Sequence, residues 1–200
     1  MRLCNENMSH IPDDKRARKS ADLMFKALIE CLKSKPLSDI TARDIQRQCG
    51  VSRATYYRLF GNNTDILRYG CMAMSEKIAL ECPEFPHDET TLERFSLFVI
   101  SSWMENHDVL EALYKCGKSS LLVECIRINT EQVKNIGALY DFGEATVDYF
   151  INMVYAMLGG ILTTWIQRGR KESAEEINEI FLRLTGRCFK ATYEYGRTNS

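Results

Sequence analysis

Apolar side chains recur at steps of three and four residues along most of the chain, which is the spacing of one face of an α-helix. In the first such segment these residues are Ala21, Met24, Phe25, Leu28 and Leu32. No run alternates apolar and polar residues in the manner of a half-buried strand. The chain has 200 residues and is 45% hydrophobic, which is enough to bury a core. The sequence therefore predicts an all-α fold.

Capping residues, glycines and prolines divide this pattern into separate helices. We expect a flexible tail over the first dozen residues. Thr41 and Ser52 are expected to cap the second and third helices, with Gly50 at positive φ between them. Ser173 and Glu176 have the spacing of a capping box before the last helix. The expected helices span residues 14–34, 42–48, 53–59, 63–82, 91–106, 109–115, 119–136, 143–168 and 173–195.

Charge is distributed unevenly along the chain, although the net charge is only −1. Residues 1–62 hold 12 Lys/Arg and 7 Asp/Glu, a net of +5, whereas residues 63–200 hold 14 and 20, a net of −6. Four cations lie between residues 15 and 19, where they oppose the dipole of the first helix. A nearby phosphate backbone would account for them, and solvated charge is the alternative. The asymmetry is typical of a chain whose N-terminal end meets a polyanion.

The eight cysteines are spread along the chain, and no two of them have C-x-x-C spacing. They are Cys4, Cys31, Cys49, Cys71, Cys82, Cys116, Cys125 and Cys188. The N-terminus lacks the pattern of a signal peptide, so reduced thiols in a cytoplasmic protein are the simplest interpretation, with a redox sensor as the alternative. The three histidines are isolated and no glycine-rich phosphate loop is present, so we expect neither metal nor cofactor.

Residues 149–166 form a nearly uninterrupted apolar segment, whose length is close to the lower limit for crossing a bilayer. Asn152, the Gly159-Gly160 pair and Thr163-Thr164 interrupt it. We expect a helix that is buried on most of its circumference, in a core or a subunit interface, rather than in a membrane.

Two short predicted helices, 42–48 and 53–59, are joined by a turn at Gly50 inside the basic region. Asp44 stands three residues after Thr41, as the acidic partner of that N-cap. Two short helices joined by a glycine-containing turn predict a helix-turn-helix.

The residues of this region are more specific than the general arrangement of two helices and a turn. The segment ITARDIQRQCGVSRATYYRLFGNNTDIL, preceded by ALIECLKSKPLSD, closely resembles the DNA-binding domain of the TetR family of bacterial transcription regulators. The shared features are Asp-Ile in the first short helix, Gly-Val-Ser at the turn, Arg-x-Thr-x-Tyr in the second helix, and the closing Phe. The resemblance implies a three-helix DNA-binding domain over residues 13–62 and a helical effector-binding and dimerisation domain over residues 63–200.

The resemblance also implies a recognition helix that begins at Ser52 and enters the major groove. Arg53 has the chemistry to bind a guanine edge, and Thr55 can touch a thymine methyl or a phosphate. Tyr57 matches a family tyrosine that anchors phosphate, whereas relatives usually carry a phosphate-binding lysine where this chain has Asn63. The expected DNA contacts are Thr41, Arg43, Ser52, Arg53, Thr55, Tyr56, Tyr57, Arg58 and Asn63, with at least one of the two tyrosines facing DNA.

The remaining helices in this family usually bind a small ligand and dimerise through the last two. The segment YAMLGGILTTWIQRGRKESAEEINEIF resembles the corresponding end of Firmicutes-type members. A homodimer interface is expected from the apolar helix with Ile177, Ile180, Phe181, Leu184 and Phe189. It would space two recognition helices roughly 34–36 Å apart on a palindrome. The expected ligand pocket is lined by Phe98, Trp103, Tyr114, Phe150 and Tyr155, with Met104 and Cys116 as further candidates and plain core packing as the alternative.

We therefore expect a ligand-responsive repressor, which binds double-stranded operator DNA as a homodimer and is released by a small, largely apolar effector. An activator would use the same parts. A helical enzyme or carrier lacks support, because the sequence offers no paired carboxylates and no nucleophile–base arrangement. A non-specific architectural DNA protein is disfavoured by the acidic body, and equal affinity for scrambled DNA would revive it.

Overall fold

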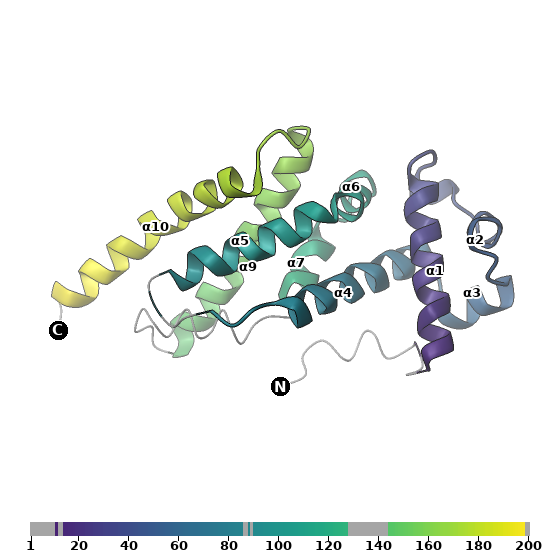
Figure 1. Ribbon diagram of the computed structural model, residues 1–200, viewed down its shortest axis with the longest axis horizontal. Coiled ribbons are helices and arrows are strands. Elements are labelled where there is room, and N and C mark those ends of the chain that lie inside the picture. Colours follow the sequence, from purple (N-terminus) through teal and green to yellow (C-terminus); the bar gives the residue numbers. More distant parts are fainter. Residues whose placement is uncertain (1–10, 12–13, 86–87, 89, 128–143, 199–200) are drawn as a thin grey trace. The chain divides into compact units, whose positions relative to one another are not determined.

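The computed structural model describes residues 11, 14–85, 88, 90–127 and 144–198, with side chains through residue 186 in the last helix. Among these residues every regular element is helical, as the sequence predicted (Figure 1). The elements are α1 (Lys15–Leu32), the 3₁₀ turn η1 (Leu37–Asp39), α2 (Ala42–Cys49), α3 (Arg53–Leu59), α4 (Asn63–Glu81), α5 (Thr91–Glu105), α6 (His107–Lys115), α7 (Ser120–Ile126), α9 (Glu144–Gln167) and α10 (Ala174–Thr198).

The predicted helix boundaries agree with these elements to within a few residues, except at the helix expected over 119–136. There α7 ends at Ile126 with Arg127 as its C-cap, and residues 128–136 of the expected helix lie outside the described residues. The expected N-terminal tail also lies outside them, apart from Ile11. The capping box before α10 is confirmed, because the Ser173 N–H donates to Glu176 Oε2 and the Glu176 N–H donates to Ser173 Oγ.

The chain divides into two compact units, one made of residues 1–77 with 111–128 and the other of residues 78–110 with 129–200. The first unit extends beyond the small domain that was expected to end at residue 62. The reason is that residues 63–77 of α4 pack inside this unit, where the Tyr69 hydroxyl donates to Asp22 on α1 at 2.8 Å. Arg68 on the same helix forms an ion pair with Glu124 on α7.

In the first unit, α1 lies alongside α2 and α3 (Figure 1). Its buried residues, among them Ala21, Met24 and Leu28, follow the three- and four-residue steps of the sequence. Asp14 caps α1 by accepting a hydrogen bond from the backbone N–H of Arg16. This carboxylate offsets part of the positive charge that crowds the start of the helix.

In the second unit, α10 packs along α5, and α9 contacts both helices (Figure 1). Large side chains fill the space between them, including the fully buried Phe95, Tyr155 and Phe181. A buried polar pair aligns α5 with α10, because the Ser96 hydroxyl donates to Asn178 Oδ1 at 2.6 Å. The Asn178 amide in turn donates to the Glu93 carbonyl, so both polar side chains are satisfied inside the core.

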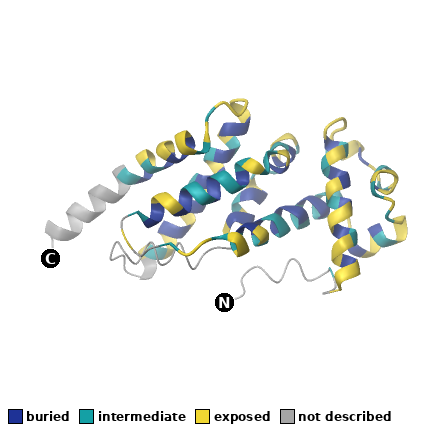
Figure 2. Ribbon diagram, in the orientation of Figure 1, coloured by how far each residue is buried: buried dark blue, intermediate teal, exposed yellow. Residues whose placement is uncertain are grey.

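Helix α9 carries the long apolar segment that was singled out in the sequence. Its portion Thr146–Gln167 is long and apolar enough to cross a membrane by length and composition, and 44% of the most apolar window is buried inside the structure. One side of α9 is buried and another is exposed (Figure 2). The exposed side includes Tyr149 and Met153, which are 79% and 37% exposed, and Gly160.

Candidate nucleic-acid interface

The site expected from the sequence is built on α2, α3 and the turn between them. Helix α2 ends at Gly50, which has φ +72° and donates its N–H to the Gln46 carbonyl. Ser52 then caps α3 by accepting a hydrogen bond from the Thr55 N–H at 3.1 Å. Ile45 on α2 and Leu59 on α3 are both buried, which fixes which side of each short helix faces outward. These features confirm the predicted turn and the predicted cap at Ser52.

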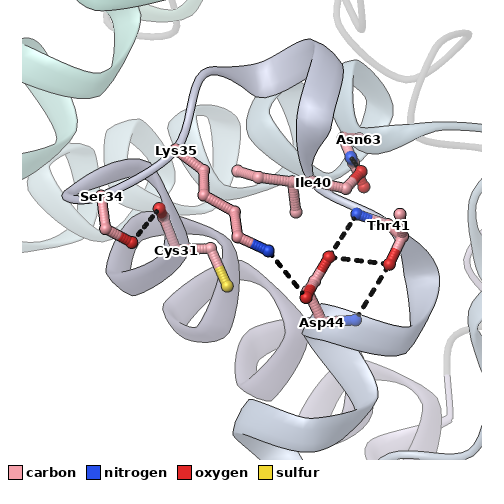
Figure 3. A network of polar contacts seen from close by, with 7 residues as sticks. All are labelled: Cys31, Ser34, Lys35, Ile40, Thr41, Asp44 and Asn63. Atoms are coloured by element: carbon pink, nitrogen blue, oxygen red, sulfur yellow. Dashed lines mark hydrogen bonds and ion pairs between the residues drawn. The ribbon is translucent and has the colours of Figure 1, made fainter.

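A network of polar contacts holds the start of α2 (Figure 3). The Asp44 carboxylate accepts hydrogen bonds from the Thr41 N–H at 2.9 Å and from the Thr41 hydroxyl at 2.7 Å. The Asp44 N–H donates back to the Thr41 hydroxyl, which completes a capping box. Lys35 reaches the same carboxylate with its Nζ 3.0 Å from Oδ1, and so ties the preceding loop to α2.

This network limits how Thr41 could contact a phosphate, and that contact stays a prediction. A hydroxyl has one proton, and that of Thr41 is donated to Asp44, so none remains for a phosphate oxygen. The Asp44 carboxylate also occupies the N-terminal end of α2, where it opposes the approach of another anion. Arg43, on the same short helix, is exposed and stays a candidate for phosphate contact.

The hydrogen bonds from Thr41 and Lys35 hold the pKa of Asp44 well below its usual range. A depressed pKa in the folded state stabilises the fold above the unfolded value of about 4, and this stabilisation is lost as the pH falls below it. We expect Asp44→Asn to lower the melting temperature at pH 7, and the difference from the wild type to shrink between about pH 4 and pH 2.

Thermal melts at a series of pH values measure this difference. Asp39→Asn is the matched control, because Asp39 lies in the same unit but accepts its hydrogen bond from the neighbouring Ser38, outside the network. A difference between Asp44→Asn and wild type that is equally large at pH 3 and pH 7 would contradict the assigned role of the charge.

Helix α3 presents its charged side chains to solvent. Arg53 and Arg58 are exposed, and Tyr57 is 60% exposed. The Ser52 and Thr55 hydroxyls are 3.0 Å apart and hydrogen-bond to each other, while Thr55 is half-buried. The exposed positions therefore include three of the residues that the sequence assigned to DNA contact from this helix.

Tyr56 lies on the other side of α3, and this corrects its predicted DNA contact. Its side chain is only 6% exposed, and its hydroxyl donates to Asn63 Oδ1 at 2.8 Å. Burial raises the pKa of the Tyr56 hydroxyl. Of the two adjacent tyrosines, the exposed one is thus Tyr57.

Asn63 was expected to replace a phosphate-binding lysine, but its side chain has an internal role. Its amide oxygen accepts from Tyr56, and its amide nitrogen donates to the Ile40 carbonyl at 2.6 Å. It therefore joins α3 and the start of α4 to the residue before the N-cap of α2. Only the second amide proton of Asn63 remains for the predicted phosphate contact.

The residues expected to line an apolar pocket lie in different places. Trp103, Phe150 and Tyr155 are buried in the second unit, and Phe98 is half-buried there with its ring 6.4 Å from that of Phe85. Tyr114 is 42% exposed and belongs to the first unit, because it follows residue 110, and its predicted place in the pocket stays a prediction. Cys116 is half-buried in the first unit, and Met104 is half-buried in the second.

The sequence interpretation missed two residues that shape the candidate interface. Asp65 accepts hydrogen bonds from the N–H groups of Gly61 and Asn62, both at 3.1 Å, and so shapes the turn after α3. The spacing of Asn62 and Asp65 is that of an N-cap motif and was a usable signal. The Lys35–Asp44 ion pair had no such signal, because it joins residues from separate elements.

Possible metal ligands and cysteine thiols occur among the residues that the structure describes. No group of three or more His, Cys, Asp or Glu side chains that could hold a metal occurs among the residues described by the structure. The described cysteines Cys31, Cys49, Cys71, Cys82, Cys116 and Cys125 are free thiols, and the side chains of Cys4 and Cys188 lie outside the described residues.

Comparison with solved structures finds a protein of similar structure. The crystal structure of Lin0861 from Listeria innocua superposes with a TM-score of 0.67, over 86% of this chain and 92% of that chain, with 14% identical residues. At this identity the likeness shows a shared fold. No family model and no curated protein matches the sequence.

Proposed function

We propose that this chain is a TetR-type transcriptional regulator, in which α2 and α3 form a helix-turn-helix and α3 reads operator DNA from the major groove. The observation that carries the proposal is the division of α3 into two sides. Tyr56 and Leu59 are buried, whereas Arg53, Tyr57 and Arg58 point away from that core. A short helix with guanidinium and phenol groups on its outer side suits both base edges and phosphates.

The electrostatics of the chain support the same proposal. The net charge of +5 within residues 1–62 favours a polyanion, and the net charge of −6 in the remainder disfavours indiscriminate binding along the whole molecule. Arg53 is the residue we assign to base recognition. Tyr57, Arg58 and Arg43 are assigned to the phosphate backbone.

A homodimer through α9 and α10 is the second part of the proposal. Tyr149, Met153, Ile180 and Leu184 are all more than a third exposed in the single chain. Ile180 and Leu184 are one helical turn apart on α10, so they lie on the same face. Burying such apolar side chains against a second copy is favourable, and the symmetry of a dimer matches a palindromic operator. Phe189, which was expected in the same interface, has no described side chain.

The proposed effector is a small and largely apolar molecule that is accommodated by the helices of the second unit. It would act by favouring a conformation whose recognition helices are wrongly spaced for DNA. We propose repression as the effect on transcription, and activation by the same architecture is distinguished by the sign of a reporter response.

The experiment starts by selecting genomic DNA fragments that bind the purified chain, and then compares variants on the selected operator. Arg53→Ala should weaken operator binding about tenfold or more and relax the base preference, because a bidentate contact to guanine provides about 1–3 kcal/mol of discrimination. Tyr57→Phe should weaken binding to operator and scrambled DNA by a similar factor, because a phosphate contact carries little sequence information.

Gln48→Ala is a suitable control, because Gln48 is exposed on α2 and is not among the assigned contacts. If both α3 variants retain wild-type affinity and base preference, the assigned recognition helix is wrong. If no fragment is enriched even at low salt, the proposed DNA-binding function is wrong.

A further inference from the structure

A cavity in the first unit lies beside α3 and is separate from the predicted aromatic pocket. Its volume is about 560 Å³, which is in the range of pockets that hold small organic molecules. It is lined by the end of α3, the turn after it, the first half of α4, and Ile11. The lining residues are Ile11, Tyr57, Arg58, Leu59, Phe60, Gly61, Asp65, Arg68, Tyr69 and Met72.

Most polar groups of this cavity already have partners in the first unit. The Asp65 carboxylate accepts from the Gly61 and Asn62 N–H groups. The Tyr69 hydroxyl donates to Asp22, and Arg68 pairs with Glu124. Asp65 carries the only carboxylate among these lining residues, and its bonds to the two N–H groups hold it against the turn after α3.

The remaining cation is Arg58. Its side chain is exposed, and it forms no ion pair or hydrogen bond with any other residue that the structure describes. A guanidinium without a carboxylate partner attracts an anion, and its planar donors can bind two oxygens of a carboxylate or sulfonate at once.

One part of the cavity wall is apolar. Leu59, Phe60 and Met72 are buried side chains that contribute to the lining, and the Phe60 and Tyr69 rings stand edge to face with their centroids 5.8 Å apart. An aromatic ring placed against these side chains would bury apolar surface from water, which favours binding. Its anionic group would reach Arg58.

We propose that this cavity is a binding site for an amphiphilic organic anion, in which an aromatic body contacts Phe60 and Met72 and a carboxylate or sulfonate binds Arg58. The site differs from the proposed effector site, because it lies within the unit that carries α3. Since Arg58 is also assigned to the phosphate backbone, an anion bound here would compete with DNA; this consequence rests on the proposed function.

The test uses 1-naphthalenesulfonate as the probe and measures its binding to the full chain by calorimetry in the absence of DNA. This choice separates the result from the proposed function, because no operator is involved. We expect Arg58→Ala to weaken binding about tenfold or more, as the loss of a charge-assisted contact requires. Arg53→Ala is the matched control, because it removes an equal charge from the same helix at a residue outside the cavity lining, and it should leave binding within a factor of two.

Two analogues test the two halves of the recognition. Both 1-naphthalenemethanol, which lacks the charge, and methanesulfonate, which lacks the ring, should bind at least about tenfold more weakly than the probe. The proposal is overturned if the probe does not bind at millimolar concentration, if the two arginine variants weaken it equally, or if either analogue binds as well as the probe. Since Arg58 is exposed, Arg58→Ala should keep the wild-type melting temperature, so loss of binding will not reflect unfolding.

Discussion

Gly70→Ala should lower the free energy of unfolding by about 2 kcal/mol, a large effect for adding one methyl group. Gly70 is buried on α4 where the ring of Phe25 on α1 covers it. A Cβ at this position would lie 2.0–2.3 Å from three atoms of that ring, among them Cγ at its base. The whole ring must then move, which costs about 3 kcal/mol, while the better helix propensity of alanine returns about 1 kcal/mol.

Urea denaturation of the purified variants measures this loss. Gly186→Ala is the matched control, because Gly186 is also in a helix and a Cβ there meets nothing within 4 Å, so stability should stay equal or rise by up to about 1 kcal/mol. In the Gly70→Ala background, Phe25→Ala should cost less than it does in the wild type, since it removes the overlapping ring. A Gly70→Ala variant as stable as the wild type would mean that α4 and α1 do not approach each other this closely.

Gly160→Leu should convert the proposed dimer into monomers and thereby abolish operator binding at nanomolar protein concentration. Gly160 is exposed on α9, and a Cβ there meets nothing within 4 Å, so the fold of the single chain has room for a larger side chain. In a dimer that packs α9 against a second copy, the same leucine would hold the two helices apart. A cost of about 2–4 kcal/mol raises the dimer dissociation constant roughly 30- to 1000-fold.

Sedimentation velocity over a range of protein concentrations reports the dissociation constants of wild type and variant. Lys26→Leu serves as the control, because Lys26 is exposed on α1 in the first unit and the change adds an equally large apolar side chain to a helix outside the proposed interface. Met153→Glu on the exposed side of α9 should weaken association as well, because it would bury an unpaired charge. Wild-type chains that remain monomeric at tens of micromolar, or a Gly160→Leu variant that dimerises as tightly as wild type, would exclude this interface.

The local rules predicted the helices well, because helix formation depends on residues that are close in sequence. The predicted caps at Thr41, Ser52 and Ser173 appear where short polar side chains precede a helix. Gly50 takes the left-handed conformation that its place between two short helices requires. These features need no knowledge of the rest of the molecule.

The candidate interface was harder to predict, because two adjacent residues of one helix point in different directions. Tyr56 and Tyr57 differ by about 100° around α3, and only packing against the other helices determines which one is exposed. The buried residue is Tyr56, and it engages Asn63, which the sequence had assigned to DNA. Thr41 is a related case, since its hydroxyl donates its proton to Asp44 rather than leaving it for a phosphate oxygen.

The sequence by itself determined that the chain is helical, where most helices begin and end, and that a turn at Gly50 joins two short helices in a basic region. Those properties follow from periodicity, capping chemistry and charge, which act over a few residues. Only the tertiary structure decided that α4 packs within the same unit as α1, that Tyr57 rather than Tyr56 is exposed, and that Arg58 borders a cavity. These properties depend on contacts between residues far apart in the chain, and local spacing carries no information about such contacts.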